Sequence, residues 1–389
     1  MRALEDLQDL VSYGPRFHGG AGIHAAADWL EREIVATGLT VRRQSVRLAG
    51  WLPGSVSRVT VLAPVERTLP AWPMLGGGAT DVVRGRVKEL GPQGLWGDSQ
   101  IWQRFVVLAD DGTAVGYLHG RDDGPAAPQP LPSGSDRTLP HLAIGHLDAR
   151  QLTEWIRDEK HPVVEIECDA YDTDAAVGDN LIVDVGGVSA GRALACAHYD
   201  TFFNTVGAYD NGSGTIALLH LIRLWAQHPP LRSLRAVFFT AEEWHLGGSR
   251  HYVELGSAPD AAPADAIADL DFVLNVDGLG RGSLMEAFAS PETFDTMLHE
   301  EIEAYAERTH RDLTLVSRFP PTTGTDDASF YRAGVPSAFM TFNDLHRLHQ
   351  PDDLPNEGIA ANIEWTVGLV RHLVDALPRA DRFPRPGIL

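Results

Sequence analysis

Cysteine is scarce in this sequence, and long apolar runs are absent from it. Cys168 and Cys196 are the 2 cysteines among 389 residues, and both lie in apolar segments. We therefore expect buried free thiols and no disulfide framework. A membrane-spanning helix needs about 18 or more consecutive apolar residues, and no stretch of the chain is of that kind. The N-terminal segment MRALEDLQDLVSYG also lacks the apolar core of a signal peptide.

Basic residues are few as well. The chain has 32 Lys and Arg against 53 Asp and Glu, which gives a formal net charge of -21. Nucleic acids and anionic membranes are bound through basic patches, so neither is expected as a partner. The apolar content of 44% is ordinary for a globular protein. These features predict a cytoplasmic protein, or a secreted one whose leader has been removed.

In the second half of the chain, short apolar runs alternate with segments of helical periodicity. The predicted strands are residues 181–185, 193–197, 236–239, 272–276, 313–316 and 337–342, and the predicted helices are 212–225, 291–309 and 356–377. Near the N-terminus, a helix over 21–37 and a strand over 39–48 are expected. Such alternation is typical of an α/β fold with a mostly parallel central sheet covered by helices on both faces.

The middle of the chain has a different character. Between about residues 53 and 171, Pro and Gly are dense, helical periodicity is nearly absent, and short β-like runs recur at 59–62, 82–87, 105–108, 114–118 and 163–168, with a short helix over 152–156. We interpret 61–171 as a small β-rich domain inserted into a main domain formed by 1–60 and 172–389.

Polar side chains follow several of the predicted strands directly. His198 and Asp200 follow one strand, Glu242 and Glu243 follow another, and Asp277 ends a third. His349 comes after the last strand, and Asp210 lies in the loop YDNGSG. In open α/β sheets ligands bind outside the carboxyl ends of the strands, so these side chains are expected to share one site.

The residue types at this site favour metal-dependent hydrolysis. The imidazoles of His198 and His349, with the three carboxylates of Asp210, Glu243 and Asp277, suit Zn²⁺, and Co²⁺ or Mn²⁺ could replace it. One carboxylate shared between two metals would let each metal reach three protein ligands, and such pairs activate a water for hydrolysis. Glu242 is placed to act as the general base, and Asp200 to hold the second ring nitrogen of His198.

Five sequence blocks resemble the co-catalytic zinc aminopeptidases. They are HYD at 198–200, GAYDNGSG at 207–214, TAEEWHLGGS at 240–249, NVDG at 275–278 and HQPDD at 349–353. That superfamily includes the bacterial leucyl aminopeptidases, carboxypeptidase Q and glutaminyl cyclase. The resemblance covers residues 1–60 and 172–389 and implies a zinc exopeptidase, phosphorylase/hydrolase-like fold. It also implies a protease-associated-like domain for 61–171.

The resemblance also implies a role for each site residue. His198 and Asp277 would bind one zinc ion, Glu243 and His349 the other, and Asp210 would bridge the two ions. Glu242 would be the general base and Asp200 the partner of His198. The peptide bond between Asp210 and Asn211 is often cis in this family.

The sequence departs from the family pattern at three places. Leu348 stands where many members have Tyr, His245 where a Gly is usual, and Thr325-Asp326-Asp327 where relatives have Ser-Asp-His. His245 could contact metal or substrate, or neither. Asp326 and Asp327 are expected to cap a helix around 329–331.

Simpler structural roles compete with the functional ones. His346 competes with His349 as a ligand, and the family-like spacing to Pro351 and Asp353 favours His349. Glu242 and Glu243 could begin a helix, and Asp210 could be a turn residue or an N-cap. Trp244 is expected in the core or the pocket wall.

The leading hypothesis is a two-zinc aminopeptidase that acts on peptides or small amides. The alternatives are glutaminyl cyclisation or hydrolysis of a specialised amide or dipeptide on the same site, and a non-catalytic binding protein that has kept the fold. These motifs specify neither the preferred N-terminal residue nor an oligomeric state.

Overall fold

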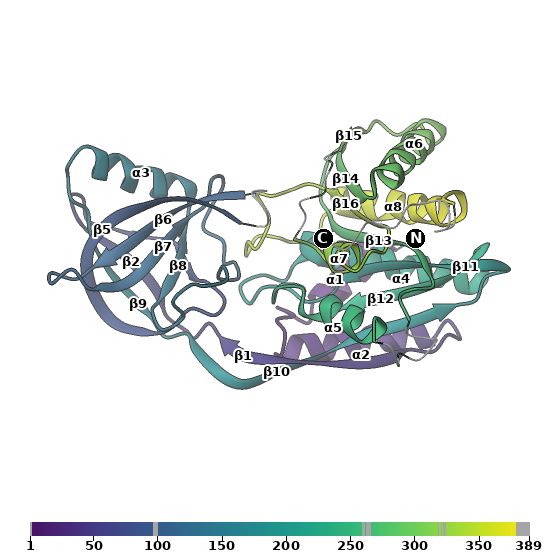
Figure 1. Ribbon diagram of the computed structural model, residues 1–389, viewed down its shortest axis with the longest axis horizontal. Coiled ribbons are helices and arrows are strands. Elements are labelled where there is room, and N and C mark those ends of the chain that lie inside the picture. The colour runs from purple at the N-terminus through teal and green to yellow at the C-terminus, as the bar shows by residue number, and fades with distance from the viewer. Residues whose placement is uncertain are drawn as a thin grey trace. The chain divides into compact units, whose positions relative to one another are not determined.

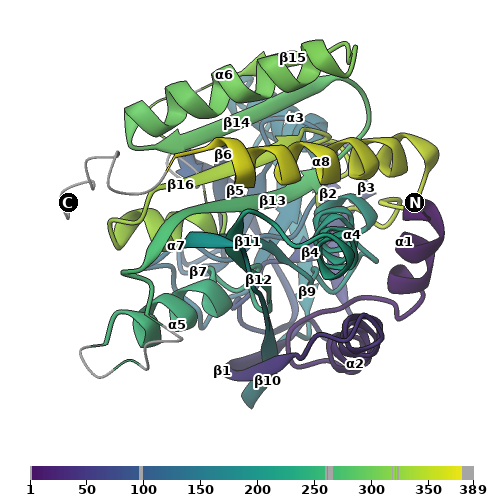
Figure 2. The ribbon, with the colours of Figure 1, turned by 90° about the vertical axis from the view of Figure 1, so that its right-hand side faces the viewer.

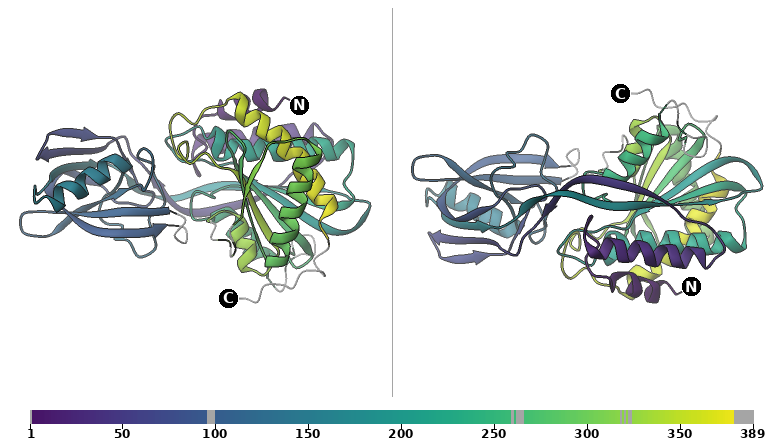
Figure 3. Two further views of the ribbon diagram at one scale, coloured as in Figure 1. Left: turned by 90° about the horizontal axis from the view of Figure 1, so that it is seen from above. Right: turned by 90° about the horizontal axis from the view of Figure 1, so that it is seen from below.

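The chain folds into two compact units (Figure 1). The computed structural model describes residues 2–95, 100–258, 261, 266–317, 319, 321 and 324–378. The first unit comprises Met1–Arg47 and Val177–Leu389, and the second comprises Leu48–Ala176. The boundaries expected from the sequence lie after residues 60 and 171. The observed boundaries differ from these because each falls inside a strand. The first boundary lies within β1 (Arg42–Leu52) and the second within the neighbouring strand β10 (Tyr171–Val185), and both strands continue from one unit into the other (Figure 3).

The first unit is built on a sheet with the strand order β1-β10-β12-β11-β13-β16-β14-β15. Its four central strands pair in parallel: β12 (Arg232–Phe239), β11 (Ser189–His198), β13 (Leu270–Leu279) and β16 (Ser337–Phe342). On either side, β10 and β14 (Leu284–Ser290) pair antiparallel with this centre. The short strand β15 (Thr314–Val316) pairs in parallel with β14. The predicted α/β fold with a mostly parallel sheet is confirmed.

Helices cover both faces of this sheet, as predicted (Figure 2). Ala193, Ala195 and Ala197 of β11 face a core shared with α1 (Ala3–Val11), α2 (Ala21–Val35), α4 (Ser213–Gln227), α6 (Glu292–Arg308) and α8 (Glu357–Ala376). Leu194 and Cys196 face a second core, which includes side chains of α5 (Gly247–Gly256) and α7 (Asp327–Arg332). The alternation follows from the two-residue period of a strand.

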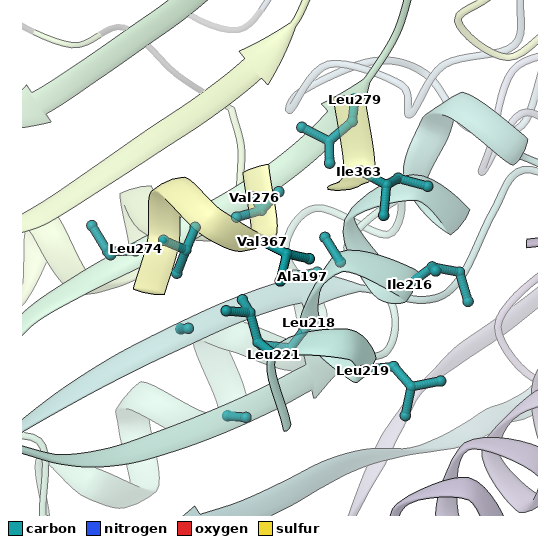
Figure 4. Packing of buried hydrophobic residues seen from close by; sticks show 14 of the residues in the cluster. Ala197, Ile216, Leu218, Leu219, Leu221, Leu274, Val276, Leu279, Ile363 and Val367 are labelled. Carbon is teal, nitrogen blue, oxygen red and sulfur yellow. The ribbon is translucent and has the colours of Figure 1, made fainter. Parts of the chain in front are cut away.

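Helix α4 fixes the segment that precedes it. Leu218 and Leu221 of α4 lie near Val367 of α8, with Leu274 and Val276 of β13 beside them (Figure 4). Each such side chain stabilises the fold by about 1.5–3 kcal/mol relative to an exposed one. Because α4 begins at Ser213, its packing restrains the loop that carries Asp210.

The elements of this unit that were not predicted include α1, β14 and α5. The strand β14 has the sequence LMEAFAS, which is rich in helix-forming residues, and its antiparallel pairing with β16 determines its conformation. Helix α5 begins with two glycines, which weaken any sequence signal for a helix. In the part of the chain that the structure describes, no helix is both long and apolar enough to cross a bilayer.

The second unit is a β-sheet with one helix against it. The strand order is β3-β2-β9-β5-β6-β7-β8-β4. Its strands are β2 (Ser57–Ala63), β3 (Arg67–Leu69), β4 (Ala71–Pro73), β5 (Thr80–Leu95), β6 (Gln100–Leu108), β7 (Ala114–Gly120), β8 (His141–Ile144) and β9 (Val163–Cys168). Helix α3 (His146–Arg157) contains the short helix predicted at 152–156. The β-rich character is thus confirmed, and the likeness to a protease-associated domain stays a prediction.

Candidate metal centre

The predicted site residues meet at the carboxyl ends of the central parallel strands. His198 is the last residue of β11 and lies in register with Phe239, the last residue of β12. Glu242 and Glu243 follow β12, and Asp277 lies near the end of β13. This convergence follows from parallel pairing, because the carboxyl ends of parallel strands share one edge of the sheet.

Asp210 lies between the two histidines. Its Oδ1 atom is 3.2 Å from His198 Nε2, and its Oδ2 atom is 3.1 Å from His349 Nε2. His198 Nε2 is also 3.2 Å from Asp277 Oδ1, and His349 Nε2 is 3.1 Å from Glu243 Oε2. The five side chains therefore form two half-sites that share Asp210.

This arrangement fits divalent metal ions. Donor atoms of His198, Glu242 and Asp277 lie within 4.8 Å of one another, and so do those of Asp210, Glu243 and His349. Mixed imidazole and carboxylate donors are the usual ligands of zinc. Glu243 Oε1 is buried and has no hydrogen-bond partner in the described structure, so one ligand atom is still available.

Buried charge dominates the electrostatics of the site. Burial lowers the pKa of His349, but Glu243 and Asp210 outweigh it and raise that pKa to about 10. Burial and the negative charge of Asp210 raise the pKa of Glu243 to about 7, against the opposing effect of His349. Several carboxylates thus share one buried space, and cations stabilise such a group.

Asp200 positions residues of both half-sites. Its Oδ1 atom lies 3.4 Å from His198 Nδ1 and accepts a 3.1 Å hydrogen bond from the Glu242 N–H. Its Oδ2 atom accepts a 3.2 Å hydrogen bond from the Glu243 N–H. Only the first of these contacts is expected from the sequence. The two backbone contacts depend on the loop after β12, which no residue pattern specifies.

Asp353 was missed as a positioning residue. It is buried, and it accepts hydrogen bonds from the backbone N–H groups of Tyr209 (2.8 and 3.0 Å) and Asp210 (3.2 Å). Asp353 belongs to the block HQPDD, and the sequence pattern indicates only its spacing from His349. The peptide bond Asp210–Asn211 is cis, as the resemblance implied.

The structure also separates the competing residues. His346 is exposed, whereas His349 is buried beside Asp210. His245 is exposed, belongs to neither donor group, and has a φ of 57°, a left-handed conformation that glycine adopts more easily. Trp244 is buried, and its ring packs at 5.2 Å from that of Phe17.

The capping role expected for Asp326 is wrong. Asp326 occupies the N-cap position of α7, but its side chain makes no capping hydrogen bond. Its carboxylate is fully buried instead, and this burial raises its pKa to about 8. Asp327 is the first residue of α7. Leu348 is partly buried and packs against the main core.

Comparison with known proteins is consistent with this geometry. Residues 180–372 match the model of Peptidase family M28. Aminopeptidase YwaD of Bacillus subtilis (strain 168) is 31% identical over 165 residues, which are 40% of this chain and 34% of YwaD. The chain thus spans about a third of the length of that relative.

Solved structures share the fold. The Peptidase M28 precursor from Shewanella amazonensis superimposes with a TM-score of 0.75 at 18% identity, covering 99% of this chain and 95% of that one. The zinc aminopeptidase BSAP from Bacillus subtilis gives a TM-score of 0.68 at 18% identity, covering 98% and 96%.

Proposed function

We propose that this chain, which belongs to peptidase family M28, is an aminopeptidase that hydrolyses the N-terminal amide bond of peptides or small amides at a two-zinc centre. The observation that carries the proposal is the position of Asp210, which directs one carboxylate oxygen to His198 and the other to His349. A carboxylate in that position can bridge two ions.

The proposed ligands divide between the two half-sites. His198, Asp277 and Asp210 would hold one zinc ion, and Glu243, His349 and Asp210 the other; Co²⁺ or Mn²⁺ could replace zinc. Bound zinc supplies a Lewis acid that polarises the scissile carbonyl and lowers the pKa of a water molecule.

Glu242 is proposed as the general base. Its side chain is half-buried, whereas the neighbouring Glu243 is buried. Burial raises the pKa of Glu242 well above the usual value, and the charges of Glu243 and Asp277 add to this against the opposing effect of His198. A raised pKa suits a group that takes a proton from water and passes it to the leaving amine. The surrounding carboxylates would also favour a free α-ammonium group.

The test combines metal content with a small substrate panel. We expect release of the aromatic amine from an aminoacyl anilide, loss of that activity after chelation, and its return with two equivalents of zinc. The N-acetylated anilide is the matched control and should not be cleaved. Equal cleavage of the two anilides, or full activity without metal, would contradict the proposal.

Adding a peptide with N-terminal glutamine to this panel separates the cyclase and the binding protein from the aminopeptidase. Ammonia release from a peptide with N-terminal glutamine, without amine release from anilides, would favour the cyclase. Zinc binding without any turnover would favour a binding protein. The cytoplasmic location expected from the sequence stays a prediction.

A further inference from the structure

Arg16 is a fully buried cation in the connection between α1 and α2. Its backbone N–H donates a 2.9 Å hydrogen bond to Thr201 Oγ1, and its carbonyl accepts a 3.3 Å hydrogen bond from the Thr201 N–H. These contacts bring the N-terminal part of the chain to the end of β11. The arginine stands more than 180 residues from its contacts in sequence, with a separation of 183 residues to Tyr199.

The guanidinium group of Arg16 joins the two segments that carry His198 and Asp210. Its Nε–H donates to the carbonyl of Tyr199 at 2.6 Å, and Tyr199 lies between His198 and Asp200. Its other nitrogens donate to the carbonyls of Val206, at 2.6 Å, and Gly207, at 3.0 Å. One planar group with fixed donor directions therefore sets the spacing of the two segments.

The contact with Gly207 extends to Asp210 through a tight turn. The carbonyl of Gly207 also accepts a 2.9 Å hydrogen bond from the Gly212 N–H, so the turn encloses Asp210. Gly207 has a φ of 55°, and a Cβ atom at this position would lie 2.3 Å from the Asp210 carbonyl oxygen. The turn is therefore closely packed, and a shift of Gly207 would move the carboxylate of Asp210.

The charge of Arg16 is offset by the acids of the site. Burial lowers the pKa of Arg16 to about 10, although Asp200, Asp353, Asp210 and Glu243 act in the opposite direction. Arg16 therefore stays protonated at neutral pH. A buried guanidinium is tolerated where its hydrogen bonds are satisfied and opposite charges are near.

We propose that Arg16 is a positioning residue, which fixes the distance between His198 and Asp210 and thereby sets the affinity of the centre for its metal ions. This inference rests on the two-metal centre proposed above. A competing role is purely electrostatic, because a cation beside a metal site repels the metal. When the charge is removed, the positioning role predicts weaker zinc binding, and the electrostatic role predicts tighter zinc binding.

The test compares zinc affinities of Arg16→Lys and Arg16→Gln with that of the wild type, by competition with a chelating dye. Lysine keeps the charge but cannot reach three carbonyls in the geometry of the guanidinium. Glutamine removes the charge and keeps two donors. Changes in groups that orient metal ligands typically weaken binding about 10- to 100-fold, and we expect a loss in this range for both variants. The absorption spectrum of bound Co²⁺ should also change, because the ligand geometry changes.

Arg235→Lys is the matched control. Arg235 is also buried, but it binds Asp184 and Tyr252, away from the centre. We expect this variant to lose stability and to keep both the zinc affinity and the Co²⁺ spectrum of the wild type.

Three outcomes would overturn the proposal that Arg16 positions the centre. Zinc affinity within twofold of wild type in folded Arg16→Lys would do so, and tighter binding in Arg16→Gln would support the electrostatic role instead. Failure of both variants to fold in saturating zinc, with a folded Arg235→Lys, would make Arg16 a residue of the fold as a whole. If the wild type itself binds no zinc, the proposed function fails, which is a different result.

Discussion

Asp353 Oδ2 accepts a 3.2 Å hydrogen bond from the backbone N–H of Asp210, so one buried carboxylate holds another in place. Replacing Asp353 with Asn would turn one acceptor into a donor that faces the N–H of Tyr209, which now donates to both oxygens. We expect a loss of about 1–3 kcal/mol in the free energy of unfolding and weaker zinc binding. Urea unfolding and zinc titration measure the two effects.

The neighbouring residue provides the control for this change. Asp352 has a 69% exposed side chain and forms an ion pair with Arg347 at 2.6 Å. Exposed pairs contribute about 0–1 kcal/mol, so Asp352→Asn should have little effect. Equal stability and zinc affinity in the two variants would show that Asp353 does not hold the Asp210 loop.

Replacing Glu242 with Gln tests whether Glu242 is the general base. The amide cannot accept the proton of water, so kcat should fall at least about 100-fold. Zinc content should stay at that of the wild type, although the Glu242 carboxylate lies within 4.8 Å of donor atoms of His198 and Asp277. Glu254→Gln, at an exposed position of α5, is the control. Loss of one zinc ion from Glu242→Gln would instead identify Glu242 as a ligand.

Replacing Asp200 with Asn should disturb both half-sites. Its two oxygens accept the N–H groups of Glu242 and Glu243, and an amide can accept only one of these hydrogen bonds without turning a donor toward the other. We expect zinc affinity to fall about 10- to 100-fold. Calorimetric zinc titration checks this, with Asp184→Asn as a control that breaks only the ion pair with Arg235. Unchanged affinity for both zinc ions would leave Asp200 without a positioning role.

The second unit should lose stability in acid. His119 is buried against His141, with 2.9 Å between His119 Nε2 and His141 Nδ1. Burial, with smaller contributions from His141 and Arg104, lowers the pKa of His119 to about 3. Below about pH 6.5 the unfolded chain gains a proton that the folded unit does not accept until about pH 3. Stability is therefore lost as the pH falls through this window, by about 2 kcal/mol at pH 5.

The variant His119→Gln tests this pH dependence. Its amide can still donate to His141 Nδ1, but it does not titrate. The difference in unfolding free energy between wild type and variant should shift by about 2 kcal/mol from pH 7 to pH 5, in favour of the variant. His228→Gln, at an exposed position, is the control for the loss of one histidine. Parallel pH profiles of wild type and His119→Gln would contradict the assignment.

The chemistry of the site could be predicted from the sequence because it depends on local patterns. A buried strand appears as an apolar run, as in residues 193–197, and the polar residue that follows it marks the strand end. Parallel strands place these ends at one edge, so His198, Glu243 and Asp277 were expected together. The same reasoning could not predict β14, whose pairing with β16 overrides its local preference.

The sequence by itself determined which side chains could bind metal and the α/β order of the chain, since residue type and periodicity are written in it. Only the tertiary structure decided how those side chains are held. Arg16 reaches Tyr199 across 183 residues, and Asp353 reaches Tyr209 across 144. Both use backbone groups as partners, and every residue except proline carries the same backbone groups, so no sequence pattern records such contacts.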